Sequence, residues 1–167
     1  MRAENHQILD AEAIASCSRR MAFQIYEANL HETQLVVFGI AQKGMAFAQL
    51  LVDELQSIAP FEILLVALDL DKSQPQGSIR TSVEPARWAN QSVVVVDDVL
   101  NTGKTLMYAV NFILQTPLKQ IKTAVLVNRS HKKYPIKGDF KGISLSTSLK
   151  EHIEVSFEGE NIGAYLS

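Results

Sequence analysis

The chain has 167 residues, of which 47% are hydrophobic and 20% are charged, and its formal net charge is −2. A chain of this length forms one domain with a sizeable core, since domains cluster near roughly 100 to 150 residues. No apolar run approaches the roughly 18 residues that a membrane helix needs, and residues 1–10 lack the apolar core of a signal peptide. We therefore expect a cytoplasmic protein with no membrane contact, and the charge excludes a chain that is basic overall.

The first predicted element is a helix that Asp10 can cap and that runs to about Asn29. Its apolar face is formed at helical spacing by Ile14, Cys17, Met21 and Ile25. The single cysteine is therefore expected to be a buried thiol without a disulfide partner. Arg19 and Arg20 fall off this face, so we expect them in solvent, with contact to a partner subunit or RNA as the alternative.

Residues 35–38 are all apolar and predict the first buried strand along the chain, and a helix is expected after Gly44. Gly39 and Gly44 bound the loop between them. Their spacing imitates a P-loop, but Met45 and the next residue stand where that motif has Lys-Ser or Lys-Thr. Lys43 and the backbone N–H groups of residues 41–44 can still supply positive charge and donors for an anion.

The next apolar strand is predicted over residues 61–70, and no regular spacing of apolar residues follows it. Residues 71–90 are polar and carry Pro75, Gly77 and Pro85, which is typical of a mobile surface loop or a loose hairpin. The polar candidates for function in this segment are Lys72, Ser78 and Arg80, and the alternative for each is an ordinary solvated side chain.

The central strand is predicted at Ser92 to Asp97, where four valines in a row indicate burial on both faces. It is expected to end at Asp97 and to be followed by a loop over residues 101–103 and by an amphipathic helix. Backbone N–H groups and the positive end of the helix dipole converge at such a helix start, so the loop can hold a phosphate.

Two adjacent carboxylates, Asp97 and Asp98, follow this strand and would repel a phosphate placed beside them. They suit the two hydroxyls of a cis-diol, and a bound Mg²⁺ can offset their remaining charge. The residues therefore predict a site for ribose 5-phosphate. A P-loop is disfavoured, because Asp98 stands where that motif needs glycine, and a helix-capping role explains two acids poorly.

A further strand is predicted over residues 121–127, with a basic cluster at its carboxyl end, on the same rim as Asp97. Arg129 is the residue of this cluster that we expect to contact the ligand, while His131 is expected to be an ordinary surface histidine. Residues 134–167 alternate between apolar and polar, which indicates half-exposed strands at an edge or in a small lobe. Phe140 either stacks on a base or packs in the core.

Residues 94–105 resemble the phosphoribosyl pyrophosphate (PRPP) binding motif of the type I phosphoribosyltransferases, with its apolar run, acid pair and Thr-Gly-x-Thr loop. The resemblance implies an α/β fold whose central, mainly parallel sheet is flanked by helices. It also implies a single domain over residues 1–167, with a flexible flap at about 71–90 and a small hood from about 134–167.

The resemblance assigns roles to individual positions. The PRPP-binding residues would be Asp97, Asp98, Val99, Leu100, Asn101, Thr102, Gly103, Lys104 and Thr105. The leaving pyrophosphate would lie on Ala41, Gln42, Lys43 and Gly44, and the flap would contribute Lys72 and Arg80. Asp97, Asp98 and Arg129 would be the catalytic set, with Arg129 in contact with the base or the pyrophosphate. Mg²⁺ would be the cofactor, held by the two acids indirectly through ligand or water.

Outside this motif, Ile8-Leu9-Asp10 and residues 125–131 look like one branch, the bifunctional pyrimidine-operon attenuator and uracil phosphoribosyltransferase family. This branch implies transfer of phosphoribose to a pyrimidine base, uracil, giving UMP and pyrophosphate. It implies homodimers or larger homo-oligomers, and RNA as a partner that the net charge does not support. The residues themselves do not fix the base, and a purine is the alternative.

Three departures from that branch open a second hypothesis. Residues 69–72 read Asp-Leu-Asp-Lys where the family has Tyr-Arg-Asp-Asp, the flap looks short, and Asn128 replaces an acid. The alternative to an efficient enzyme is therefore a regulator that senses PRPP or a nucleotide with weak or no catalysis.

Overall fold

The computed structural model describes residues 6–167, which form two β-sheets and three α-helices. The elements are β1 (His6–Asp10), α1 (Ala11–Glu27), β2 (Gln34–Ile40), α2 (Ala41–Ile58), β3 (Glu62–Asp69), β4 (Arg80–Thr81), β5 (Ser92–Leu100), α3 (Lys104–Ile113), β6 (Gln120–Arg129), β7 (Phe140–Leu145), β8 (Ile153–Ser156) and β9 (Gly163–Leu166). A 3₁₀ turn, η1, spans Pro85–Arg87. Within the described residues, no helix combines the length and the apolar composition needed to cross a bilayer.

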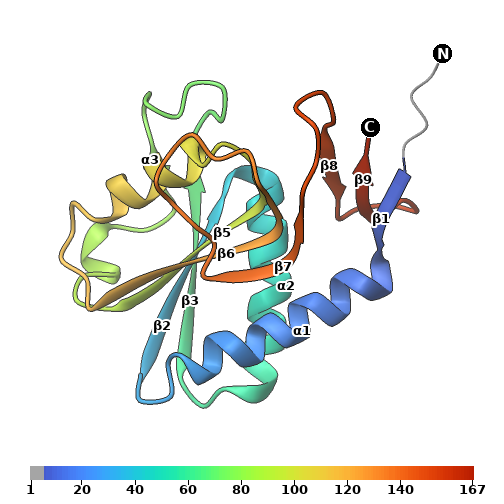
Figure 1. The fold of residues 1–167 in the computed structure, drawn as a ribbon. Coiled ribbons are helices and arrows are strands. Elements are labelled where there is room, and N and C mark those ends of the chain that lie inside the picture. The colour runs from blue at the N-terminus through green and yellow to red at the C-terminus, as the bar shows by residue number, and fades with distance from the viewer. Residues whose placement is uncertain (1–5) are drawn as a thin grey trace.

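The larger sheet has six strands in the order β4-β3-β2-β5-β6-β7, and only β4 runs antiparallel to its neighbour. Strand β5 lies inside this sheet, with Val94 and Val96 facing the core under α1 and α2. Val93 and Val95 face the opposite core, which α3 covers. Figure 1 shows the helices on both sides of the sheet. The predicted α/β fold with a central, mainly parallel sheet is confirmed.

Helix α1 begins as predicted, because the Asp10 side chain accepts a hydrogen bond from the Ala13 backbone N–H at 2.8 Å. Three of its four predicted core residues are buried, together with Ala22, and the fourth differs. Cys17 is only half-buried, and the neighbouring Ser18 is buried instead. Ser18 tolerates burial because its hydroxyl donates to the Ile14 carbonyl at 2.8 Å, which satisfies the polar group inside the core.

The smaller sheet has three antiparallel strands in the order β1-β9-β8. It brings the first and last described strands side by side (Figure 1). The small hood was expected to consist of residues 134–167 alone, and the small sheet differs from this in the strands that form it. Strand β1 joins this sheet from the N-terminal side, and β7 instead pairs in parallel with β6 at the edge of the larger sheet. Phe140 of β7 packs in the core and is 8% exposed, so it is not placed to stack on a base.

Several element boundaries also differ from those that the sequence predicts. Strand β5 continues to Leu100, three residues past Asp97, because it keeps pairing with β6. Helix α2 starts directly after β2, so residues 41–44 form its first turn and not a glycine-bounded loop. The segment 71–90 contains β4 and η1, and Trp88 near its end is buried against Phe38, with ring centroids 5.2 Å apart. Trp88 therefore anchors the end of this segment on the sheet, while residues 84–87 before it stay exposed.

Candidate functional site

Asp97 and Asp98, the acid pair, lie near the carboxyl end of β5 and are only 3% and 5% exposed. Asp97 Oδ1 accepts hydrogen bonds from Lys72 Nζ at 2.7 Å and from the Asp98 backbone N–H at 2.9 Å. Asp98 Oδ1 accepts from the same Lys72 Nζ at 3.0 Å. One ammonium group therefore bridges the two carboxylates, and this lysine belongs to the segment between β3 and β4.

The pKa values of Asp97, Asp98 and Lys72 depend on one another. Burial raises the pKa of Asp97 to about 8, and the charge of Asp98 acts in the same direction against the attraction of Lys72. Burial also acts to raise the pKa of Asp98, but Lys72 and hydrogen bonds from Asp97 and the Val99 backbone hold it below its ordinary value. Burial acts to lower the pKa of Lys72, and the two carboxylates raise it instead. The ionisation of each group therefore depends on the other two, and Lys72 is the cation that offsets the negative charge of the acid pair.

The acid pair forms one wall of a cavity of about 480 Å³. Every residue that the sequence assigns to PRPP binding lines it: Asp97, Asp98, Val99, Leu100, Asn101, Thr102, Gly103, Lys104 and Thr105. The end of β5 and the start of α3 bring these positions together, so unpaired N–H groups of the first helical turn face the same space as the carboxylates. The Lys104 N–H also donates to Thr102 Oγ1 at 3.3 Å, so the remaining N–H groups of this turn are the ones free to hold an anion. The carboxylates at the other end can accept hydrogen bonds from hydroxyl groups of a ligand.

Gly103 sets the turn between β5 and α3. Its φ is +86°, in the left-handed region that side chains other than glycine rarely adopt. A Cβ atom here would also lie 2.7 Å from Ile136 Cγ2. The carbonyl of the neighbouring Thr102 accepts hydrogen bonds from the backbone N–H groups of Lys133 and Tyr134, which fixes the loop from the other side.

The first turn of α2 carries the residues expected to bind pyrophosphate. Lys43 lines the cavity and forms an exposed ion pair with Glu154 of β8 at 3.4 Å. Gly44 packs directly against the acid pair, since a Cβ atom there would lie 3.1 Å from Asp97 Oδ1. Ala41 and Gln42 line shallower hollows beside the cavity and not the cavity itself. Ala41 has a φ of +53°, an uncommon conformation for alanine.

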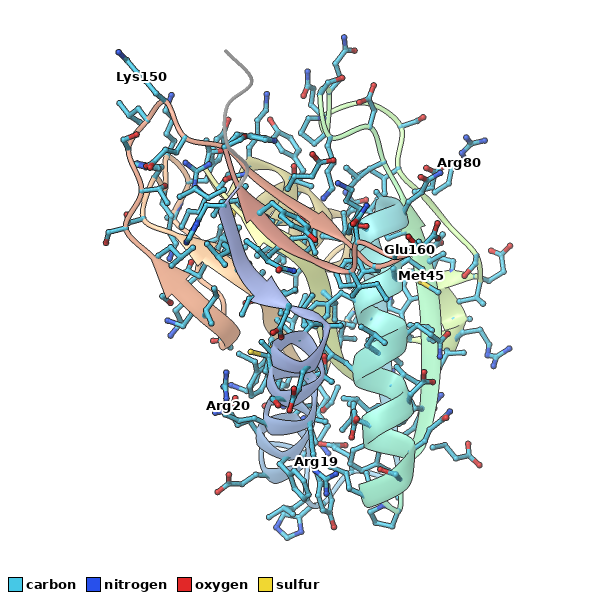
Figure 2. The ribbon with its side chains drawn as sticks, turned by 90° about the vertical axis from the view of Figure 1, so that its right-hand side faces the viewer. Arg19, Arg20, Met45, Arg80, Lys150 and Glu160 are labelled. Atoms are coloured by element: carbon cyan, nitrogen blue, oxygen red, sulfur yellow. The ribbon has the colours of Figure 1, made fainter. Side chains whose placement is uncertain are left out.

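Of the two flap candidates, Lys72 and Arg80, only Lys72 lies at the cavity. Arg80 instead pairs with Asp69 at 3.3 Å, and both side chains are largely exposed. Figure 2 shows Arg80 projecting outward, away from the sheet. Ser78 is also exposed. Strand β4 pairs with β3 at the outer edge of the sheet, and this pairing directs Arg80 away from the site.

Arg129 is 6% exposed and does not line the cavity, which differs from the direct ligand contact that we expected. Its guanidinium donates to Asn101 Oδ1 at 2.8 Å and to Thr147 Oγ1 at 2.8 and 3.0 Å. It also donates to the backbone carbonyls of Ser148 and Glu151. The donors are used within the protein, so Arg129 connects the loop after β5 to the segment before β8. His131 contacts the same hydroxyl, at 3.3 Å from Thr147 Oγ1.

Four cavity residues were not found from the sequence: Leu106, Val125, His152 and Ile153. His152 and Ile153 enter from the smaller sheet, where the His152 backbone exchanges two hydrogen bonds with Ser167. The alternation of polar and apolar residues over 152–157 predicts a strand, but no local signal says that this strand reaches the acid pair.

The resemblance implies Mg²⁺, an ion that prefers oxygen ligands. Among residues 6–167, no three His, Cys, Asp or Glu side chains are grouped to hold a metal ion. Asp97 and Asp98 offer two carboxylates, but Lys72 Nζ is bonded to an oxygen of each. In this arrangement the protein alone does not fit a divalent ion, which takes six or more oxygen ligands.

The chain is similar to known proteins over most of its length. Two bacterial relatives named "Bifunctional protein PyrR" are each 33% identical to it. The relative from Pelotomaculum thermopropionicum aligns over 95% of this chain and 92% of its own length. The relative from a Geobacter species aligns over 95% of this chain and 94% of its own length.

Solved structures share the fold. A hypoxanthine-guanine phosphoribosyltransferase from Bacillus anthracis has a TM-score of 0.76 at 14% identity and covers 99% of both chains. A hypoxanthine phosphoribosyltransferase from Staphylococcus aureus has a TM-score of 0.72 at 17% identity, covering 86% of this chain and 79% of its own. The family model described as "Phosphoribosyl transferase domain" matches residues 4–158, which include β5, the acid pair and the loop after it. The chain therefore belongs to the phosphoribosyl transferase domain family.

Proposed function

We propose that this protein transfers phosphoribose from PRPP to a pyrimidine base, uracil, and releases UMP and pyrophosphate. The observation that carries the proposal is the convergence of the acid pair and of residues 99–105 on one cavity of about 480 Å³. That volume falls within the range of roughly 300 to 1,000 Å³ that is usual for small-molecule sites. The relatives named "Bifunctional protein PyrR" support a pyrimidine over a purine, although the structural neighbours act on hypoxanthine.

In this reaction the bond between ribose C1 and the pyrophosphate oxygen breaks, and its electron pair leaves with pyrophosphate. A new bond forms from C1 to the uracil nitrogen, whose proton is released to water. The transition state has oxocarbenium character, as in other glycosyl transfers. The protein's part is positioning and charge stabilisation, and no covalent nucleophile is required.

The proposed roles follow from position in the cavity. The acid pair accepts hydrogen bonds from the two ribose hydroxyls, and the N–H groups at the start of α3 bind the 5-phosphate. Lys43, which lines the cavity from α2, lies close enough to offer charge to the leaving pyrophosphate. We propose that Mg²⁺ enters with PRPP and not as an ion held by the protein alone.

Arg129 is proposed as a positioning residue. It bonds Asn101, which lines the cavity, and the carbonyl of Glu151, which directly precedes His152 at the opposite wall. Its substitution should therefore change how the two walls face each other without removing a group that touches the substrate.

The test is an assay of PRPP, Mg²⁺ and each of a panel of bases, scored for pyrophosphate release and for the nucleotide formed. We expect uracil to give UMP at a rate well above those of the other pyrimidines and of hypoxanthine. Efficient turnover of hypoxanthine with none of uracil would contradict the pyrimidine assignment while leaving phosphoribosyl transfer in place.

A second candidate is a regulator that binds PRPP or a nucleotide with weak catalysis. It is favoured by Leu70, which is 6% exposed and packs in the core at a position where the branch described above carries arginine. An RNA-binding form of this regulator would need a basic face. Arg129 is buried and Arg20 donates to the carbonyls of Lys141 and Gly142, so the exposed Arg19, Lys132 and Lys133 would have to supply most of it. PRPP binding by the protein without UMP formation in the same assay would favour the regulator.

A further inference from the structure

We propose that Lys72 is an internal cation that occupies the acid pair and keeps divalent metal ions off Asp97 and Asp98 in the ligand-free protein, so that an ion reaches them there only by displacing its ammonium group. The inference rests on the proposed function, which brings a metal-bound ligand into this cavity. It deepens that function by naming the group of this chain with which the metal must compete.

The geometry places one ammonium between two buried carboxylates. Lys72 Nζ lies 2.7 Å from Asp97 Oδ1 and 3.0 Å from Asp98 Oδ1. The two acid side chains are 4% and 8% exposed, so a cation that compensates them has to sit inside the cavity. A metal ion bound to these same Oδ1 atoms and the Lys72 ammonium would carry like charges into the same space. Both cannot remain there.

The backbone of Lys72 is held in place by the preceding residue. The Asp71 carboxylate accepts hydrogen bonds from the backbone N–H of Ser73 at 2.8 Å and from its hydroxyl at 2.6 Å. The Asp71 carbonyl also accepts from the Gln74 N–H, which closes a turn around Lys72. The turn presents the lysine to the cavity, so its contact with the acid pair follows from the local chain conformation.

Only the side chain has to move for the exchange. The Lys72 side chain is 38% exposed, and its flexible stem of four carbons allows the ammonium to turn into solvent. Lys43 lines the same cavity but pairs with Glu154 at 3.4 Å, and its side chain is 46% exposed. The two lysines therefore share a cavity and differ in their partner, which makes Lys43 a matched control.

The experiment titrates Mn²⁺, as a paramagnetic probe for Mg²⁺, into the ligand-free full-length protein and follows water proton relaxation. We expect Lys72→Met to bind Mn²⁺ about tenfold more tightly than wild type or better, because the competing charge is gone. Lys43→Met should stay within about twofold of wild type, since that charge is exposed and screened. Lys72→Arg keeps a cation at the acid pair and should bind Mn²⁺ as weakly as wild type.

Two results would overturn the inference. An equal gain in Lys72→Met and Lys43→Met would mean that any positive charge at this cavity repels the ion. An unchanged affinity in Lys72→Met would mean that the ammonium does not compete. Lys72→Gln serves as a second variant if circular dichroism shows that Lys72→Met is unfolded. The titration contains no PRPP, so its result does not depend on PRPP binding. A wild-type protein that failed to bind PRPP would contradict the proposed function without changing the outcome of the Mn²⁺ titration.

Discussion

Arg129 Nη1 at the end of β6 donates to Asn101 Oδ1 at 2.8 Å, which ties the loop after β5 to the segment that leads into β8. The same guanidinium holds the Thr147 hydroxyl and two carbonyls of that segment. A buried guanidinium needs such acceptors, because each unpaired donor would carry a desolvation penalty. Two walls of the cavity are therefore joined through a side chain that does not line it.

The first prediction concerns this connection. Thr147→Val removes one acceptor from a buried arginine and should lower the free energy of unfolding by about 1–2 kcal/mol. Arg129→Lys keeps the charge but loses the planar guanidinium with its several donors, so we expect the free energy of unfolding to fall further, by about 2–4 kcal/mol. Urea unfolding measures both. The exposed Lys132→Ala is the control and should change stability by less than about 0.5 kcal/mol.

The same variants test the positioning role separately from stability. If Arg129 only supports the fold, the folded fraction of Thr147→Val should have wild-type kinetics. We expect instead a raised KM for PRPP at a nearly unchanged kcat, because the walls shift while the groups that touch substrate remain. An unaltered KM would limit Arg129 to a structural role.

The second prediction compares two glycines with positive φ. Gly103 has a φ of +86° and Gly159 a φ of +73°, but a Cβ at Gly103 would meet Ile136 Cγ2 at 2.7 Å, while nothing lies within 4 Å of one at Gly159. Gly159→Ala should cost about 1–2 kcal/mol from the backbone alone. Gly103→Ala should cost more, and it should also weaken PRPP binding at least tenfold. Equal effects of the two substitutions on stability and binding would contradict this reading of the loop.

The third prediction is a pH dependence far from the cavity. Glu32 accepts hydrogen bonds from Lys119 Nζ at 2.9 Å and Ser92 Oγ at 3.0 Å. The bond from Lys119 lowers the pKa of Glu32 below 4.5, and Ser92 adds to this against the opposing effect of burial. The folded state therefore binds the proton less tightly than the unfolded state, so the stabilisation is present above about pH 4.5 and is lost as the pH falls below it.

Glu32→Gln is the matching variant. We expect it to lower the free energy of unfolding by about 1 kcal/mol at pH 7, and we expect the difference from wild type to shrink in acid. Denaturant unfolding at pH 7, 5 and 3.5 checks this. A difference that stays constant over the three pH values would mean that the Glu32 charge does not contribute.

The sequence predicts the fold class well because its strongest patterns are local. The valine run of β5 and the alternation of its two faces define a central parallel strand, and Asp10 marks the start of α1. The acid pair and residues 99–105 are adjacent in sequence, so their convergence on one cavity follows from a strand, a loop and a helix in that order.

What the sequence did not predict depends on contacts between distant segments. Lys72 and Arg80 look alike as charged residues in a polar stretch, and only the pairing of β4 with β3 separates them. Arg129 lies at the expected rim, but the acceptors from 147–151 that turn it away from the cavity lie in a later segment. His152 reaches the site through a sheet that begins at the other end of the chain.

The fourth prediction concerns the acid pair itself. Asp97→Asn with Asp98→Asn replaces two buried carboxyls by groups of the same shape and leaves Lys72 free to be hydrated, because its side chain is 38% exposed. We expect the double variant to fold, with an unfolding free energy within about 2 kcal/mol of wild type. Asp53→Asn, an exposed acid on α2 that bonds Gln49, is the control for the loss of negative charge.

Calorimetric titration of PRPP with Mg²⁺ into wild type, the double variant and the Asp53→Asn control tests the central claim most directly. If the two carboxylates hold the ribose hydroxyls, wild type and the control bind PRPP alike and the double variant loses at least a hundredfold in affinity. A folded double variant that binds PRPP as tightly as wild type would contradict the account.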